Sequence, residues 1–211
     1  ITAVRRIDSI NLRIARQVLG AADKLCSHYR KYGIGGTLIV GPPASGKTTV
    51  LKDLCRQFSN GMIGESKKVS LIDERGEIAA VYNGQPQNDV GWNTDVFDGY
   101  SKQIGIDIAI RCMSPDVIIC DEIGGRGDEA SIISGINAGV VMIATAHALT
   151  FEELLNRRNM ADILKSGAFP WIVLMDNIKN VGRIKEIVRY DQIHRTVVNV
   201  SDFSRNGLSF I

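Results

Sequence analysis

The sequence predicts an α/β protein in which helices sandwich a mostly parallel sheet and an antiparallel hairpin follows at the C-terminal end. Two observations carry this prediction. Short runs of consecutive apolar residues alternate with segments of helical periodicity, the pattern of a parallel sheet covered on both faces. The chain has 211 residues, of which 45% are hydrophobic and 23% charged, and this is enough to bury one full core.

The expected elements follow in order along the chain. An amphipathic helix over residues 14–32 comes first and is ended by glycines. Apolar runs predict strands at 37–40, 69–72, 117–120, 140–144 and 171–175. Helical spacing predicts helices at 48–58, 104–113 and 129–138, and two short ones within 151–164. Alternating residues predict the hairpin at 183–190 and 196–200, whereas we assign no element to the long polar stretch 76–103.

Composition and charge exclude several classes of protein. The 25 Lys and Arg residues against 23 Asp and Glu give a net charge of +2, too small to indicate nucleic acid or an anionic membrane as a partner. No apolar run approaches the ~18 residues that span a bilayer. The cysteines and histidines complete no zinc spacing, so we expect four reduced cysteines: Cys26, Cys55, Cys112 and Cys120. The start at Ile1, without Met, suggests a fragment of a longer protein.

A phosphate-binding loop is predicted at residues 41–48, which match G-x-x-x-x-G-K-[ST] between a predicted strand and a predicted helix. Its backbone N–H groups and the positive end of the helix would surround phosphate oxygens. Lys47 would reach the β- and γ-phosphates, and the Thr48 hydroxyl would ligate Mg²⁺. The nucleotide-binding residues expected here are Gly41, Pro42, Pro43, Ala44, Ser45, Gly46, Lys47, Thr48 and Thr49.

Two acids follow the apolar run 117–120 and supply the second half of the expected site. They lie at the carboxyl end of a strand, where ligands bind in open α/β sheets. Asp121 would hold Mg²⁺, through a water molecule, and Glu122 would face the attacking water. The alternative is a pair of solvated acids in a turn.

Two further strand ends carry polar residues with less specific signals. Asp73 and Glu74 follow the strand at 69–72, either as a second acidic motif of the site or as a helix cap or surface pair. His147 ends the strand after the metal-binding strand, where it could sense the γ-phosphate through a hydrogen bond or serve a structural role.

An arginine supplied by a neighbouring subunit is a common way to neutralise transition-state charge in such sites. The candidates lie in loops or near element ends: Arg75, Arg111, Arg126, Arg157 and Arg158. The sequence does not choose between them and places none to act within its own subunit. Trp92, in the long polar stretch, could stack on adenine, contact a partner or anchor its own loop.

Seven motifs occur together in an order that resembles the ATPase domain of the stage III sporulation protein AA family. They are residues 41–48, 73–75, 86–91, 94–96, 113–119, 121–124 and 145–147. The resemblance covers about residues 11–176, and the family is similar in turn to type II and type IV secretion ATPases. Its members often carry Gly where Ala44 stands and Arg where Asn93 stands. Because Asn93 stands at this position, the long loop lacks one candidate arginine that other members of the family often have.

The resemblance implies a RecA-like P-loop NTPase core that binds ATP and Mg²⁺ and assembles into a homo-hexamer. It implies that the ring powers a transport channel between mother cell and forespore in endospore-forming bacteria. The protein would then be cytoplasmic, peripheral at the mother-cell side of the forespore membrane, and would contact membrane-embedded channel proteins without spanning the membrane. The family also has an N-terminal domain, so residues 1–211 would be a single RecA-like ATPase domain, the C-terminal portion of a longer protein.

The aspartate box, the second acidic motif and the histidine box of secretion ATPases align with Asp73-Glu74, Asp121-Glu122 and His147. We expect Glu122 to orient the attacking water, Glu74 to have a secondary part, and Lys47 and His147 to complete the catalytic set. Two other functions stay open. A DNA-acting RecA-like ATPase would need basic loops that the net charge of +2 does not indicate. A nucleotide-dependent assembly scaffold would bind ATP with little turnover.

Overall fold

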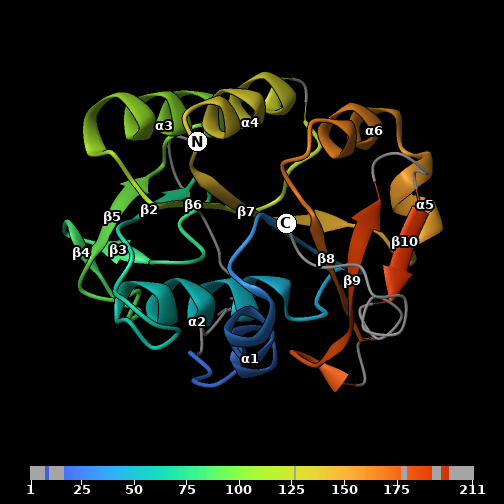
Figure 1. Ribbon diagram of the computed structural model, residues 1–211. Coiled ribbons are helices and arrows are strands. Elements are labelled where there is room, and N and C mark those ends of the chain that lie inside the picture. The colour runs from blue at the N-terminus through green and yellow to red at the C-terminus, as the bar shows by residue number, and fades with distance from the viewer. Residues whose placement is uncertain (1–7, 10–16, 126, 177–179, 192–195, 200–211) are drawn as a thin grey trace.

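A computed structural model describes residues 8–9, 17–125, 127–176, 180–191 and 196–199, and Figure 1 shows a central sheet between two layers of helices. The sheet has eight strands in the order β10-β9-β8-β1-β7-β6-β2-β5. In that order they are Thr196–Asn199, Ile184–Asp191, Trp171–Met175, Thr37–Gly41, Val141–His147, Val117–Cys120, Val69–Asp73 and Thr94–Asp98. The strands from β8 to β5 run parallel, whereas β9 and β10 are antiparallel. The predicted fold class is therefore confirmed.

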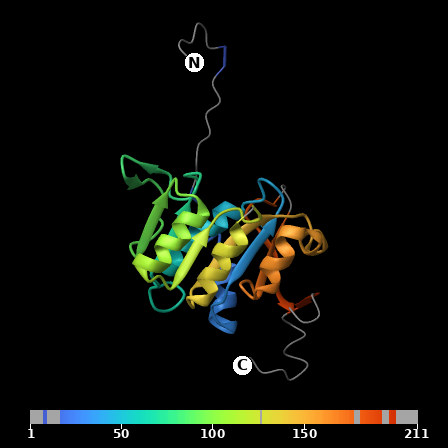
Figure 2. The ribbon, with the colours of Figure 1, turned by 90° about the horizontal axis from the view of Figure 1, so that it is seen from above.

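Each face of the sheet is covered by its own helices. α1 (Asp23–Tyr32) and α2 (Lys47–Ser59) lie on one face. The other face carries α3 (Lys102–Ile108), α4 (Asp128–Asn137), α5 (Phe151–Asn156) and α6 (Arg158–Lys165), of which α3, α4 and α6 form a row across the sheet (Figure 2).

The strand β1 shows why the central strands are apolar without interruption. Leu38 and Val40 belong to the core under α3 and α4, and Ile39 between them belongs to the core under α1 and α2. Successive side chains of a strand point to opposite faces, so a strand buried on both sides needs apolar residues at every position.

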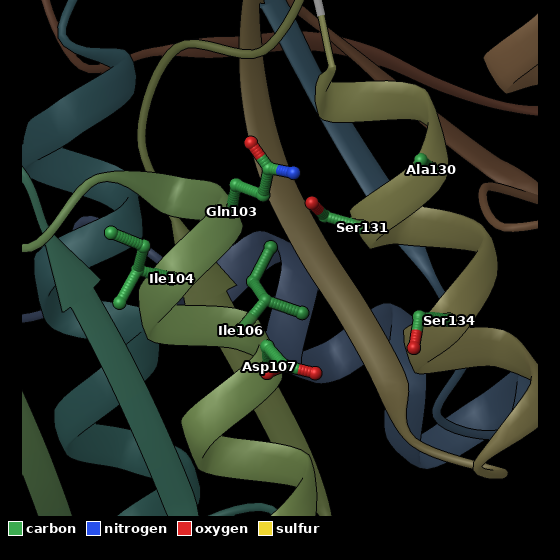
Figure 3. Close-up of a pocket in the computed structure, with 7 residues that line it drawn as sticks. All are labelled: Gln103, Ile104, Ile106, Asp107, Ala130, Ser131 and Ser134. Atoms are coloured by element: carbon green, nitrogen blue, oxygen red, sulfur yellow. The ribbon is translucent and has the colours of Figure 1, made fainter.

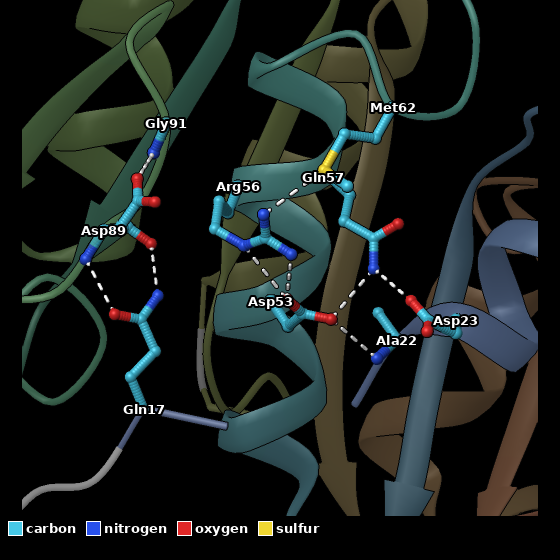
Figure 4. Close-up of polar contacts among 9 residues, drawn as sticks. All are labelled: Gln17, Ala22, Asp23, Asp53, Arg56, Gln57, Met62, Asp89 and Gly91. Atoms are coloured by element: carbon cyan, nitrogen blue, oxygen red, sulfur yellow. Dashed lines mark hydrogen bonds and ion pairs between the residues drawn. The ribbon is translucent and has the colours of Figure 1, made fainter. Parts of the chain in front are cut away.

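The first helix is shorter than its sequence predicted. Residues 10–16 lie outside the described part, residues 19–22 form a turn, and α1 begins at Asp23. The backbone N–H of Ala22 donates to Asp53 of α2 at 2.9 Å. Figure 4 shows Asp53 at the centre of a buried polar network, where it also accepts hydrogen bonds from Arg56 and Gln57. This network fixes the start of α1 on α2.

The long polar stretch also differs from its prediction, because it contains an edge strand of the main sheet. β5 pairs with β2 in parallel, and β3 (Val81–Tyr82) and β4 (Gln85–Pro86) form a small separate ribbon. In β5 only Phe97 is buried, so its sequence lacks the apolar run that marks the central strands. The helix predicted at 104–113 begins earlier, at Lys102, and changes to a π-helical turn over Ala109–Met113.

Cys26, Cys55 and Cys120 are buried free thiols, and burial raises the pKa of each to about 12, which favours the inert thiol form. Within the described residues, no helix combines the length and the apolarity needed to cross a bilayer.

Candidate functional site: a phosphate-loop pocket

The predicted phosphate loop connects β1, in the middle of the sheet, to the first turn of α2. Two residues of the loop have positive φ angles, 59° at Ala44 and 93° at Gly46. A Cβ atom on Gly46 would lie 2.4 Å from the backbone nitrogen of Gly182, so both conformation and space require glycine there. The loop curls around the N-terminus of α2, an arrangement that suits an anion.

A pocket of about 340 Å³ opens over this loop. The loop and the start of α2 contribute Pro43, Ala44, Gly46, Lys47, Thr48 and Thr49. Other strand ends and loops contribute Arg75, Glu77, Asp121, Glu122, His147 and Val181. Gly41 and Pro42 are not among the lining residues but accept hydrogen bonds from Lys47, and Ser45 is buried.

Lys47 is held in the pocket by backbone carbonyls. Its Nζ donates to the oxygens of Gly41 at 3.0 Å and Pro42 at 2.9 Å, and lies 3.1 Å from Nδ1 of His147. Burial lowers the pKa of Lys47, while the charges of Asp121 and Glu122 oppose that shift. These three contacts can engage all three N–H donors of the ammonium, so a bound phosphate would have to replace some of them.

Thr48 and Asp121, the two expected metal ligands, lie next to each other. The Thr48 hydroxyl donates to Oδ2 of Asp121 at 2.9 Å, and Oδ1 accepts from the backbone N–H of Glu122 at 2.9 Å and from the Thr145 hydroxyl. A hydroxyl and a carboxylate side by side fit Mg²⁺, which prefers oxygen ligands and is usually held by one or two protein groups together with phosphates and water. The described residues contain no cluster of three His, Cys, Asp or Glu that would hold a metal by themselves.

Glu122 lines the pocket and has a left-handed backbone conformation, with φ 47°. Its backbone N–H donates to Asp121 and, at 2.8 Å, to the Thr145 hydroxyl, so two side chains hold this uncommon conformation. Its carboxylate faces two cationic or polar groups. Arg75 lies 2.5 Å from Oε2, and Nε2 of His147 lies 3.4 Å from Oε1.

Asp73 shapes the loop after β2 and does not enter the pocket. Its buried carboxylate accepts backbone hydrogen bonds from Glu77 at 3.0 Å, Ile78 at 3.0 Å and Ala79 at 2.8 Å. Those bonds fold the loop back toward the phosphate loop. As a result Arg75 and Glu77 line the pocket.

Glu74 differs from its neighbours in this loop, because the structure does not bring it into the pocket. Its carboxylate pairs with Lys102 of α3 at 2.5 Å. Of the four residues expected to be catalytic, the pocket therefore contains Lys47, Glu122 and His147. Sequence reasoning missed Glu77. The one feature of the sequence that could have indicated Glu77 is its position four residues after Asp73. The Asp73 carboxylate accepts the backbone N–H of Glu77 and so holds Glu77 near the pocket.

The candidate arginines are separated by the fold. Arg75 reaches the pocket of its own chain, although the sequence placed no arginine there. Arg111 and Arg157 pair with acids of their own helical segments, at 2.9 Å and 2.6 Å. Arg126 lies outside the described residues, and so does the side chain of Arg158.

Trp92 lies too far from the pocket to stack on a base bound there. Its side chain is 76% exposed, and its backbone N–H donates to Asn60, which follows the C-terminal end of α2. The phosphate loop lies at the other end of this 13-residue helix, about 20 Å away at ~1.5 Å per residue.

A second groove, of about 550 Å³, lies between α3 and α4 (Figure 3). Its lining residues are Gln103, Ile104, Ile106, Asp107, Ala130, Ser131 and Ser134. It has more volume than the phosphate-loop pocket but offers no cation to a phosphate, and its one charged side chain is an acid. The phosphate-loop pocket is therefore the candidate site.

Comparisons with known proteins concern the family and the fold of the chain. Residues 1–196 match the sequence profile of the family described as "Sporulation stage III, protein AA". The chain is 37% identical over 193 residues to "Stage III sporulation protein AA" of Bacillus subtilis, an alignment that covers 91% of this chain and 62% of that protein. The chain thus spans less than two thirds of the length of this relative.

Solved structures show the same fold at low sequence identity. The VirB11 ATPase of the Brucella suis type IV secretion system, in complex with sulphate, superposes with a TM-score of 0.54 at 18% identity, covering 81% of this chain and 52% of that chain. The pilus retraction motor PilT with bound ADP superposes with a TM-score of 0.51 at 17% identity, covering 74% of this chain and 46% of that chain.

Proposed function

This chain belongs to the sporulation stage III protein AA family, and from that membership and the geometry of its pocket we propose that it binds and hydrolyses ATP with Mg²⁺. One observation supports this most directly. The Thr48 hydroxyl and the Asp121 carboxylate come from motifs 73 positions apart, yet they meet at 2.9 Å beside Lys47. A bound metal supplies charge neutralisation for the phosphates at this point.

The other residues of the pocket have separate tasks in the proposed reaction. Lys47 binds the β- and γ-phosphates, and the N-terminus of α2 binds the phosphate oxygens near it. The Glu122 carboxylate orients a water molecule and accepts its proton as the water oxygen bonds to the γ-phosphorus. The bond between that phosphorus and the bridging oxygen breaks, and ADP leaves with the bridging oxygen. Glu122 then releases the proton to solvent.

The biological role that we propose comes from the family and from the secretion-type fold. The whole protein would form a hexameric ring, in the cytoplasm at the mother-cell side of the forespore membrane, and would drive a transport channel through contacts with membrane-embedded channel proteins. The VirB11 protein, which has a similar fold, belongs to a type IV secretion system.

A scaffold with little turnover is the second candidate, and one observation favours it. Both carboxylate oxygens of Glu122 face partners, Arg75 and His147, so in this conformation the proposed base is not ready to accept a proton. A ring that releases Glu122 only when assembled with ATP and its channel would bind nucleotide and turn it over slowly by itself.

Phosphate release measured against protein concentration tests the proposal. We expect activity to rise more than linearly with concentration and to be lost in Lys47→Ala, because the mutant lacks the charge that holds the β- and γ-phosphates. Lys31→Ala, at an exposed lysine outside the pocket, is the matched control. Parent-level hydrolysis by Lys47→Ala would contradict the phosphate-loop assignment. Strictly linear activity from a monomer would contradict the ring.

A further inference from the structure

The strands beside β1 give the phosphate loop two chemically different flanks. On one flank, β7 and β6 end at His147, Asp121 and Glu122, which the proposed function places around the metal and the γ-phosphate. A nucleotide is a linear chain of γ-, β- and α-phosphate, ribose and base. With its γ-phosphate on that flank, a nucleotide that lies across the phosphate loop extends its base toward the other flank, where β8 runs parallel to β1.

The chain that follows β8 returns to the phosphate loop at Gly182. Its backbone N–H donates to the oxygen of Ser45 at 2.8 Å. The same backbone packs so closely on Gly46 that a Cβ there would lie 2.6 Å from the Gly182 Cα. The two ends of this segment are joined by a hydrogen bond of 2.8 Å, which the backbone N–H of Asp176 donates to the backbone oxygen of Arg183. Gly182 is therefore fixed against the loop that binds phosphate.

Val181 is an exposed apolar side chain at the edge of this contact. It lines the pocket together with Pro43 and Ala44, yet 61% of its surface is exposed. The charged residues that line the pocket come from other segments of the chain: Lys47, Arg75, Glu77, Asp121 and Glu122. Val181, in the segment between β8 and β9, thus adds an apolar side chain to a largely polar pocket, and an apolar wall with few polar groups suits a flat ligand ring.

We propose that Val181 forms the apolar wall of the nucleobase subsite, with Gly182 holding it in place on the phosphate loop. The proposal deepens the proposed function and depends on it. The base covers the exposed Val181 side chain, and the phosphates bind Lys47 and the α2 N-terminus. Contact with Val181 distinguishes a nucleotide from free polyphosphate but does not distinguish one purine from another.

Equilibrium binding of ATP, ADP and inorganic tripolyphosphate to the whole chain tests this subsite. The variants are Val181→Ser and Val181→Leu, which change apolar contact without adding charge near the phosphates. Val18→Ser is the matched control, because Val18 is also an exposed valine, at 50%, and does not line the pocket.

We expect Val181→Ser to weaken ATP and ADP binding by about three- to tenfold, the scale of losing one or two apolar carbon contacts. Val181→Leu should keep or raise the affinity for ATP and ADP. The affinity for tripolyphosphate should stay within about twofold of the parent value in every variant. Unchanged ADP binding in Val181→Ser, or an equal loss for tripolyphosphate, would overturn the subsite. A parent chain that binds none of the three ligands would refute the proposed function itself, whereas parent binding with unaffected Val181 variants refutes the subsite alone.

Discussion

The ammonium of Lys47 lies 3.1 Å from Nδ1 of His147, which fixes the tautomer of the imidazole. An ammonium only donates hydrogen bonds, so Nδ1 must accept, and the ring proton resides on Nε2. Nε2 faces Oε1 of Glu122 at 3.4 Å. The register of β1 and β7 causes this alignment, because it pairs Gly41, at the start of the phosphate loop, with His147. His147 thus links the proposed phosphate-binding and water-orienting residues.

This link predicts a positioning role for His147. We expect His147→Ala to lower the turnover number by about ten- to hundredfold, the scale of losing a hydrogen bond to a charged group, and to change ATP affinity little. His147→Gln should lose less, because its amide can also accept from Lys47 and donate to Glu122. Steady-state kinetics and nucleotide binding for both variants check this. Equal losses of turnover in the two variants would contradict the proposed link from Lys47 through His147 to Glu122.

The second prediction separates the glutamates. Glu122→Gln should lower turnover by ~10²–10⁴-fold and leave ATP binding intact, because it removes a positioned general base. Glu74→Gln should have a much smaller effect, since Glu74 pairs with Lys102 outside the pocket. Turnover and affinity are to be measured for both variants side by side. A deeper loss in Glu74→Gln would reverse the assignment and support a catalytic aspartate box.

The third prediction concerns stability in acid. Burial, followed by the charge of Lys31, lowers the pKa of His28 to about 4, and its ring packs against Trp171 at 4.4 Å. Unfolded His28 takes up a proton below about pH 6.5, whereas folded His28 does so only near pH 4. Proton uptake therefore favours unfolding, and the free energy of unfolding should fall by about 3 kcal/mol between those values.

His28→Phe provides the comparison, because phenylalanine keeps the aromatic packing and does not titrate. Chemical denaturation at pH 7, 5.5 and 4 measures the free energy of unfolding of both proteins. The parent should lose more stability than the variant as the pH falls, while carboxylates contribute to both equally. Parallel curves would show that His28 is not buried in its neutral form.

The sequence could predict those parts of the fold that follow from local burial. The strands β1, β6 and β8 are buried on both faces, so each is a continuous apolar run. The strand β5 could not be predicted in this way, because pairing with β2 alone makes Thr-Asp-Val-Phe-Asp a strand. Residues 19–22 form a turn because Asp53, far along the chain, accepts the N–H of Ala22.

The same distinction applies to the site. Lys47, Thr48, Asp121 and Glu122 follow strand ends within compact motifs, so their meeting could be predicted. The directions of Glu74 and Glu77 could not, because they depend on the backbone bonds to Asp73 and on Lys102 of α3. Val181 could not be predicted either, because its place results from the backbone contact between Gly182 and Ser45.

The last prediction concerns Arg75, which the sequence left among five candidates and the structure places beside Glu122 of its own chain, 2.5 Å from Oε2. This pairing arises because β2 and β6 are neighbours, so the chain segments that follow them meet at the pocket. The Arg75 side chain is 63% exposed, and an ion pair so accessible to solvent stabilises the fold little. We therefore expect Arg75 to act in catalysis, because a γ-phosphate offers it a more highly charged partner than Glu122 does.

We expect bound ATP to draw Arg75 from Glu122 to the γ-phosphate, which frees the carboxylate to orient water. Arg75→Ala should then lower turnover by roughly 10³-fold or more, the scale of losing an arginine that stabilises the transition state. The turnover of Arg75→Lys should lie between that of the parent and that of Arg75→Ala, since an ammonium keeps the charge but lacks the two-pronged geometry of guanidinium. Arg111→Ala, at an exposed arginine paired with Asp107, is the control. Phosphate release at saturating ATP is the measurement. If Arg75→Ala hydrolyses ATP as fast as the parent or faster, the pair only restrains Glu122, and the arginine of the transition state must come from a neighbouring subunit.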